Sequence, residues 1–265
     1  MSVALITGAS SGMGVIFARK LAQAGHDVTL VARRQDRLAE VAAKLTRDFR
    51  IRAEPLVADL ATDDGVQAVV NYIDSTPGLE VLVNNAGFGT KGLFFDADIT
   101  GQEQMHRVHV MATMRLTHAA LRKMVPQRKG AVINVSSVAA FTIGAGSVSY
   151  GATKAWMNAF TEGLDAELRA VGSPVKVQAL CPGFTITEFH DTLGMDRSLI
   201  PGWLWLSAEE VVDTALGALQ SGKVIVIPGW QYKLFVTILR LLPGPLLRKF
   251  GQSSGRRMKR IDTRR

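Results

Sequence analysis

The sequence contains little cysteine and no apolar run long enough to cross a bilayer. Its 265 residues include one cysteine, Cys181, which excludes an internal disulfide and favours a reducing compartment. The most apolar late stretch, residues 234–247, is interrupted by Arg240, Pro243 and Pro245, whereas a membrane-spanning helix needs roughly 20 apolar residues. The opening residues, MSVALITGAS, lack the basic segment of a signal peptide. We therefore expect a cytoplasmic protein.

Acidic residues are scarce in the C-terminal part of the chain. The formal net charge is +8, but residues 233–265 hold ten Lys or Arg against one acid, Asp262, whereas the preceding 232 residues hold 21 basic and 22 acidic side chains. The body is therefore neutral, which predicts no nucleic-acid partner. Apolar side chains followed by clustered cations fit peripheral contact of residues 231–265 with an anionic membrane. They equally fit packing of the apolar part on the body or on a partner subunit.

The body alternates short apolar, β-branched runs with longer amphipathic stretches. This alternation predicts an α/β doubly wound Rossmann fold, with a seven-stranded parallel sheet and helices on both faces. We expect one domain over residues 1–230 and an apolar, then basic, helical tail over 231–265. The predicted strands are Val3–Ile6, Val28–Val31, Ala53–Val57, Val81–Val83, Ala131–Val135, Val175–Ala179 and Val224–Ile227, and the predicted helices span 12–24, 35–48, 62–75, 102–124, 150–170 and 207–220.

A glycine-rich segment follows the first predicted strand and opens the first predicted helix. Glycine is needed where a backbone turns tightly, approaches a pyrophosphate or lets a helix pack closely on a strand. The N–H groups at the start of the helix then face the phosphates. The position indicates a dinucleotide site formed by Thr7, Gly8, Ser10, Ser11, Gly12, Met13 and Gly14.

The end of the second predicted strand indicates which dinucleotide binds. An NAD site usually places an acid there for the ribose 2′-OH, but this strand ends in Arg33-Arg34. Because a guanidinium can bind a 2′-phosphate through paired hydrogen bonds, the sequence favours NADP(H), with Arg33 as the principal contact. The alternative is two solvated arginines. Asp59, followed by Leu60, could accept a hydrogen bond from the adenine amino group or cap the helix that begins near Thr62.

A tyrosine and a lysine four residues apart begin a predicted helix. Tyr150 and Lys154 would project from one helix face, and Ser137 lies just past the fifth predicted strand. A nearby ammonium favours the phenolate, so we expect Lys154 to lower the pKa of Tyr150 toward the working range of an acid–base group. The alternative is a surface tyrosine and lysine that merely share a helical turn.

With these motifs the sequence resembles the short-chain dehydrogenase/reductase family over residues 2–190. TGASSGMG is similar to the family's TGxxxGxG, Asn84-Asn85-Ala86-Gly87 to its NNAG, Tyr150-Gly151-Ala152-Thr153-Lys154 to its YxxxK, and Pro182-Gly183 with Thr187 to its PGxxxT segment. The resemblance implies that Tyr150 is the general acid–base, that Ser137 orients the carbonyl, and that Lys154 binds the nicotinamide ribose. It implies further cofactor contacts from Asn85, Ala86, Gly87, Pro182, Gly183, Thr185 and Thr187.

One position departs from the family pattern. The family has a catalytic asparagine where this chain has His109, between Val108 and Val110. An imidazole can hold a water or shuttle a proton, so we include His109 among the candidate catalytic residues; the alternative is a packed histidine with no catalytic part. His106 and His109 have a spacing found in metal sites, but without a carboxylate or cysteine cluster we predict no metal.

The segment after PGxxxT, residues 184–206, corresponds in the family to a flap over the substrate. Its apolar side chains favour a lipophilic ketone or a 3-oxoacyl lipid over a sugar, unless they only close the protein's own core. We expect an NADPH-dependent carbonyl reductase that forms a homodimer or homotetramer. The rival interpretation is a nucleotide-binding regulatory protein without turnover. The apolar flap residues are Phe184, Phe189, Leu193, Met195, Leu199, Ile200, Trp203, Leu204, Trp205 and Leu206.

Overall fold

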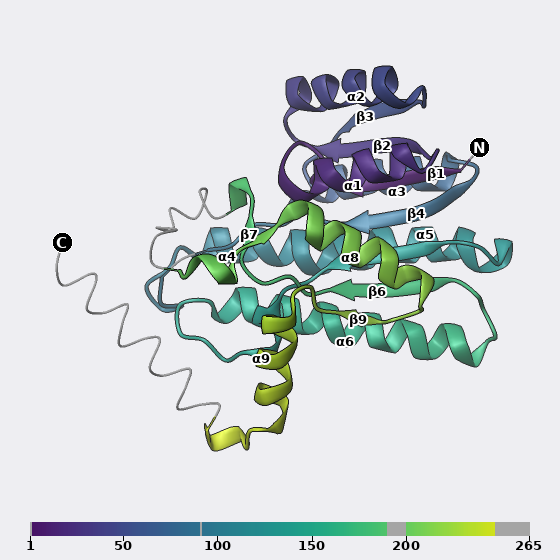
Figure 1. Ribbon diagram of the computed structural model, residues 1–265. Helices are drawn as coiled ribbons and strands as arrows, with labels where there is room; N and C mark the ends of the chain where they lie inside the picture. The colour runs from purple at the N-terminus through teal and green to yellow at the C-terminus, as the bar shows by residue number, and fades with distance from the viewer. Residues whose placement is uncertain (1, 91, 190–199, 247–265) are drawn as a thin grey trace.

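Seven parallel strands form the centre of the molecule (Figure 1). The computed structural model describes residues 2–90, 92–189 and 200–246. Because the strand order reverses direction between β1 and β4, the sheet has the switch point at which doubly wound folds bind ligands. The predicted fold class is confirmed. In sheet order, the strands are β3 (Ala53–Val57), β2 (Asp27–Ala32), β1 (Val3–Thr7), β4 (Leu79–Asn84), β5 (Ala131–Val135), β6 (Lys176–Leu180) and β9 (Ile225–Val226).

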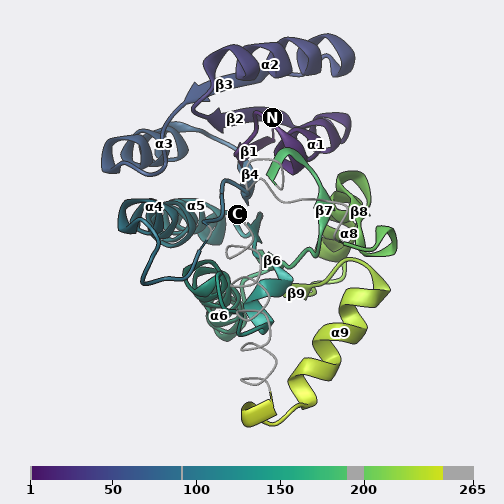
Figure 2. The same ribbon diagram turned by 90° about the vertical axis from the view of Figure 1, so that its left-hand side faces the viewer.

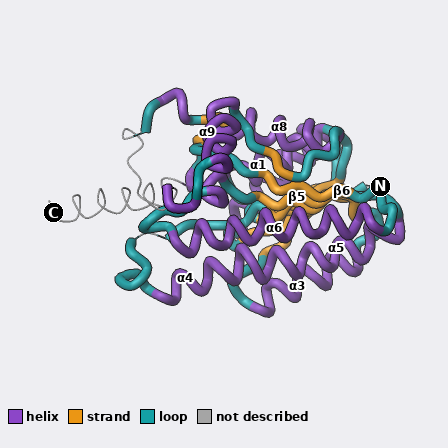
Figure 3. The backbone as a smooth tube through the Cα atoms, turned by 90° about the horizontal axis from the view of Figure 1, so that it is seen from below, coloured by secondary structure: helices purple, strands orange, loops and turns teal. Residues whose placement is uncertain are grey.

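Helices cover both faces of this sheet, as Figure 3 shows. One face packs against α1 (Gly12–Gln23), α2 (Gln35–Phe49) and α8 (Ala208–Gln220). The other packs against α3 (Asp63–Ser75), α5 (Thr113–Gln127) and α6 (Val148–Ala170). Two hydrophobic cores result, one on each face, and the apolar strands between them are buried from both sides.

Polar side chains fix where two of these helices begin. The Thr62 hydroxyl accepts a hydrogen bond from the Gly65 N–H at 3.0 Å and so caps α3. At α8 the Ser207 hydroxyl accepts from the Glu210 N–H at 3.1 Å. Each cap satisfies one of the N–H groups that a helix leaves unpaired at its start.

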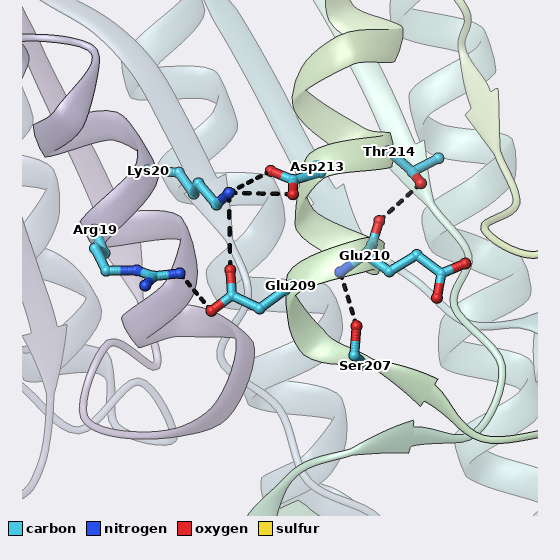
Figure 4. Close-up of polar contacts among 7 residues, drawn as sticks. All are labelled: Arg19, Lys20, Ser207, Glu209, Glu210, Asp213 and Thr214. Carbon is cyan, nitrogen blue, oxygen red and sulfur yellow. Dashed lines mark hydrogen bonds and ion pairs between the residues drawn. The ribbon is translucent and has the colours of Figure 1, made fainter. Parts of the chain in front are cut away.

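Ion pairs join the first helix to α8 across the surface (Figure 4). Arg19 pairs with Glu209, and Lys20 lies 2.8 Å from Asp213. These side chains are partly exposed, so each pair contributes little to stability. The position of α8 depends mainly on its buried apolar residues Val211, Val212 and Ala215.

The predicted helix over 102–124 is interrupted in the structure. It consists of α4 (Ile99–His106), a π-helical turn η1 (Arg107–Ala112) and α5. A π-helical turn inside a helix is rare and is often found at functional sites. This one carries His109.

The predicted tail begins as a helix against the body. Helix α9 (Trp230–Leu241) buries Tyr232 and Val236, so at least part of the tail packs on the domain. No helix in the described part of the chain is long and apolar enough to cross a membrane. Two short strands, β7 (Thr185–Ile186) and β8 (Leu206–Ser207), pair beside α8.

Candidate active site

The predicted site residues gather at the carboxyl edge of the sheet. The glycine-rich turn follows β1, Arg33 follows β2, Asn85 follows β4, Ser137 follows β5 and Gly183 lies beyond β6. In parallel strands these ends lie on the same side, so segments far apart in sequence meet there. A short 3-10 turn, η2 (Val138–Phe141), leads from Ser137 toward α6.

The glycine-rich turn is shaped by close backbone approaches. Gly8 has φ of 66°, a left-handed conformation that favours glycine. A Cβ on Gly14 would lie 2.2 Å from the Gly8 carbonyl oxygen, so only glycine lets α1 approach the turn this closely. The Thr7 hydroxyl accepts hydrogen bonds from the N–H groups of Asn85 and Ala86, both at 2.9 Å. These hydrogen bonds join the start of the glycine-rich turn at Thr7 to the segment after β4 at Asn85.

The first turn of α1 is open to an anion. Ser11 is its N-cap residue but makes no capping hydrogen bond with its side chain. The backbone N–H groups that follow, from Gly12 to Gly14, have the orientation that binds phosphate at a helix start. Together with the glycine turn, this arrangement fits the pyrophosphate of a dinucleotide.

Both arginines after β2 lie beside this turn, but they differ in their contacts. The Arg34 guanidinium donates to the Ser10 hydroxyl at 2.9 Å. Arg33 is exposed and has no hydrogen-bond or ion-pair partner among the described residues. A 2′-phosphate at the end of β2 could therefore contact the solvent-exposed guanidinium of Arg33 and the guanidinium of Arg34, which is bonded to the glycine-rich turn.

Glu188 connects the start of the flap to the same arginines. Its carboxylate lies 2.8 Å from Arg37 and 3.4 Å from Arg34. Hydrogen bonding by Arg37 lowers the pKa of Glu188, so the carboxylate is charged at neutral pH. No local sequence pattern indicates this contact, because it joins residues about 150 positions apart.

Asp59 occupies the predicted place beyond β3, next to the buried Leu60. Its carboxylate accepts a hydrogen bond from the Ala61 N–H at 3.0 Å. The cap of α3 is Thr62 rather than Asp59, which corrects the alternative role considered for Asp59. The adenine contact stays a prediction.

The three predicted catalytic residues lie together at the carboxyl edge of the sheet: Ser137, Tyr150 and Lys154. The Ser137 hydroxyl caps η2 by accepting from the Ala139 N–H at 3.1 Å, and its side chain lies close enough to Tyr150 to influence the pKa of the phenol. The Lys154 ammonium donates to the Val135 carbonyl oxygen at 2.7 Å and lies 5.7 Å from the centre of the Tyr150 ring. The end of β5 thus holds the lysine beside the tyrosine.

Burial dominates the acid–base behaviour of this group. It raises the pKa of Tyr150 to about 12, and the Ser137 side chain acts in the opposite direction. Burial also lowers the pKa of Lys154 to about 7. The sequence predicts that the Lys154 ammonium lowers the pKa of Tyr150. This expectation is wrong, because burial raises that pKa and the Ser137 side chain, rather than Lys154, acts against the rise. A protonated Tyr150 is suited to donate a proton.

His109 is fully buried and both of its ring nitrogens are engaged. Nε2 accepts a hydrogen bond from the Phe88 N–H at 3.2 Å, and Nδ1 lies 3.0 Å from the Thr153 hydroxyl. Since a backbone N–H can only donate, Nε2 must be unprotonated and Nδ1 carries the hydrogen. Burial lowers the pKa of His109 well below its usual value. The catalytic role stays a prediction, and this geometry favours a positioning role.

Comparison with known proteins places this arrangement in a family. The model of the short chain dehydrogenase family matches residues 2–198. The chain belongs to the short-chain dehydrogenase family. It is 31% identical over 245 residues to a 3-oxoacyl-[acyl-carrier-protein] reductase of Aquifex aeolicus, covering 87% of this chain and 97% of the relative.

Two solved structures of dehydrogenases show the same architecture. A short-chain dehydrogenase from Sphingobium yanoikuyae in complex with NADPH is 34% identical, with a TM-score of 0.82, and the match covers 87% of this chain and 89% of that one. A bulky-bulky ketone specific alcohol dehydrogenase from Comamonas testosteroni is 26% identical, with a TM-score of 0.77, over 98% and 94% of the two chains. Family membership makes the chain an oxidoreductase.

In this short-chain dehydrogenase, Tyr232 on α9 supports the flap. Its hydroxyl accepts from the Phe184 N–H at 2.9 Å and donates to the Leu204 carbonyl oxygen at 2.6 Å. A Cβ on Gly183 would lie 2.0 Å from the Tyr232 ring, so the ring fills the space that glycine leaves. Tyr232 therefore joins the beginning and the end of the flap, a function that the sequence did not reveal.

One aromatic side chain of the flap, Phe189, lies beside Tyr150, and two others pack on each other. The Phe189 and Tyr150 ring centres are 6.1 Å apart, and those of Phe184 and Trp205 are 5.5 Å apart. The predicted flap residues Leu193, Met195 and Leu199 lie outside the described residues.

Some of the predicted cofactor contacts also hold the loop after β6 in place. The Pro182 backbone carbonyl oxygen accepts a hydrogen bond from the Val138 N–H, and the Thr185 hydroxyl donates to the Gly183 carbonyl oxygen. Thr187 lies against Gly12.

Buried amides hold the strand ends together below the site. The Asn84 side-chain amide donates to the side-chain oxygen Oδ1 of Asn134 at 2.8 Å, and the Asn134 side-chain amide donates to the Thr161 hydroxyl at 3.0 Å. This network ties β4 and β5 to α6 and so fixes the helix that carries the tyrosine and the lysine. Among the described residues no group of three His, Cys, Asp or Glu could hold a metal ion.

Proposed function

We propose that this enzyme uses NADPH to reduce the carbonyl of a hydrophobic ketone or 3-oxoacyl lipid to an alcohol. The observation that carries the proposal is the group formed by Ser137, Tyr150 and Lys154 at the carboxyl edge of the sheet, beside a glycine turn that fits a pyrophosphate. When bound there, NADPH supplies the hydride that reaches the carbonyl carbon.

Residues of the chain itself bind and protonate the carbonyl oxygen of the substrate. The Ser137 hydroxyl hydrogen-bonds to the substrate oxygen and orients it, and Tyr150 donates the proton as negative charge develops there. Its high pKa keeps the phenol protonated at neutral pH. Lys154, held by Val135, would bind the nicotinamide ribose and lie close enough to Tyr150 to stabilise the phenolate left after proton transfer.

The choice of NADPH rests on the charges beyond β2. Arg33 and Arg34 stand where an NAD site needs an acid, and Arg34 already contacts the glycine turn through Ser10. The similarity to a dehydrogenase solved with NADPH supports the same choice.

The substrate class rests on the apolar flap. Phe189 lies beside Tyr150, and Phe184 and Trp205 of the same flap pack on each other. The similarity to a bulky-ketone dehydrogenase and to a 3-oxoacyl reductase supports a large apolar substrate. The alternative is a regulatory protein without turnover. It does not explain why Ser137, Tyr150 and Lys154 lie together.

The proposal is tested by following NADPH absorbance with a panel of aromatic, steroid-like and 3-oxoacyl ketones. We expect turnover by the unmodified enzyme, and loss of it in Tyr150→Phe with NADPH binding kept, because the lost hydroxyl serves the substrate oxygen. Arg33→Asp should weaken NADPH binding more than about tenfold and spare NADH, since a charge-assisted contact is lost. NADPH binding without reduction of any ketone would favour the regulatory alternative.

A further inference from the structure

Helix α9 leaves one apolar side uncovered. Trp230, Leu234, Ile238 and Leu241 are 73%, 54%, 49% and 79% exposed. Their spacing of four, four and three residues places them along one side of the helix, which we call the outer stripe. The buried Tyr232 lies on the other side. Figures 1 and 2 show α9 on the outside of the molecule, next to β9.

The outer stripe is accompanied by an unusual excess of positive charge. Lys233 on α9 is exposed, and residues 247–265, which follow in sequence, hold eight Lys or Arg against one acid, Asp262. The rest of the chain is close to neutral. A row of large exposed apolar side chains marks an interaction surface, and the basic composition of the sequence that follows favours a negatively charged partner.

We propose that the outer stripe docks on the surface of an anionic lipid membrane. Apolar side chains would enter the boundary between headgroups and acyl chains, while each nearby Lys or Arg contributes about 1 kcal/mol of attraction to anionic lipid. At 12 residues α9 is about 18 Å long, too short to span the roughly 30 Å hydrocarbon core. Because its apolar side chains run along its length, it would lie in the plane of the surface. A second copy fits less well, because each copy carries the same excess of positive charge, eight Lys or Arg against one acid over residues 247–265.

Docking in this way would bring the flap and the turn after Ser137 close to the lipid surface. The inner side of α9 holds both ends of the flap through Tyr232. Arg240 lies over the Phe141 ring, 5.0 Å from its centre, and Phe141 ends the turn that begins after Ser137. The inference does not depend on the proposed reaction, since binding is measured without substrate.

The test is sedimentation of the full-length enzyme with two kinds of vesicle, phosphatidylcholine alone and phosphatidylcholine with phosphatidylserine. We expect binding to the phosphatidylserine vesicles only, decreasing as salt rises. Leu234→Gln should reduce it about tenfold, whereas Val171→Gln, at an apolar residue 69% exposed at the end of α6, should not.

The charge is tested with a matched pair of double variants. Arg256→Gln/Arg257→Gln should weaken vesicle binding by at least about tenfold, whereas Lys44→Gln/Arg47→Gln, which removes two exposed cations of α2, should leave it unchanged. Thermal unfolding confirms that all variants fold. The proposal is overturned if the unmodified enzyme fails to bind at low salt, or if binding survives both Leu234→Gln and the tail variant. It is also overturned if Leu234→Gln changes the oligomeric state but not vesicle binding.

Discussion

His109 shows what a single substitution does to a family pattern. The imidazole lies between the Phe88 backbone and Thr153, and Thr153 in turn donates to the Tyr150 carbonyl oxygen at 2.9 Å. The π-helical turn that carries His109 is thereby fixed to the start of α6. A neutral ring with both nitrogens bonded acts as a bridge between two elements.

We expect His109→Asn to keep turnover within a few-fold of the unmodified enzyme and to lower its thermal stability. The shorter side chain leaves the Phe88 N–H without its acceptor, a loss of about 1–2 kcal/mol. Steady-state kinetics and thermal unfolding measure the two effects. His118→Asn, at an exposed histidine of α5, is the control. A large loss of kcat with unchanged stability would instead support the proton-relay role.

At the scale of elements, Glu188 binds an arginine that the proposed NADPH site would use. Its carboxylate holds Arg34 and Arg37, and Arg34 is one of the two arginines available to a 2′-phosphate. We expect Glu188→Gln to tighten NADPH binding several-fold and leave NADH binding unchanged, because the guanidinium no longer has a charged partner. Titration of both cofactors by fluorescence measures this.

Glu209→Gln provides the matched comparison for Glu188. Glu209 is also a partly exposed glutamate paired with an arginine, but it joins α8 to α1 (Figure 4). It should not alter the affinity for either cofactor. Equal tightening of NADPH and NADH by Glu188→Gln would show that the carboxylate acts on the flap rather than on the 2′-phosphate site.

Tyr232 belongs to the element scale because it joins α9 to the flap. Tyr232→Phe keeps the ring on Gly183 but removes the hydroxyl that bonds Phe184 and Leu204. We expect KM for a bulky ketone to rise about tenfold, in proportion to the one or two hydrogen bonds lost, with kcat changed much less. Tyr72→Phe, which also removes a bridging phenol but far from the flap, should lower stability and leave KM unchanged.

The sequence predicted local features well and long-range contacts poorly. The sequence predicts all seven strands of the main sheet near their observed places, mostly because buried parallel strands are continuous apolar runs. It does not predict the short pair β7 and β8. The glycine turn and the tyrosine–lysine pair were recognisable because their residues are close in sequence. The contacts of Glu188 with Arg37 and of Tyr232 with Phe184 have no local pattern. The pKa of Tyr150 was expected to fall because the sequence shows the neighbouring charge but not the burial.

At the scale of the whole molecule, Lys154 opposes folding. Its pKa is lowered from 10.5 to about 7 in the native protein, so between these values the unfolded chain binds more protons. Stability must therefore rise with pH across this window, and the full cost of burying the lysine is present below pH 7. A functional residue thus weakens the fold that positions it.

We expect Lys154→Met to raise the melting temperature most at pH 6 and least at pH 9, because the substitution removes a charge whose burial is costly only while it is protonated. Thermal unfolding of the enzyme without added cofactor, at several pH values, measures this. Lys176→Met, at an exposed lysine of β6, is the control. A pH-independent gain would show that packing rather than ionisation is responsible.

The position of β1 in the middle of the sheet has a consequence for biosynthesis. It leaves the ribosome first, pairs with β2 soon afterwards, and needs β4 for its other side. Roughly 50 residues separate the end of β2 from the end of β4, which at about 5–20 residues per second means several seconds of translation. During that time an apolar strand edge stays open to other chains, so a chaperone that shields the nascent N-terminal half would increase the yield of active enzyme.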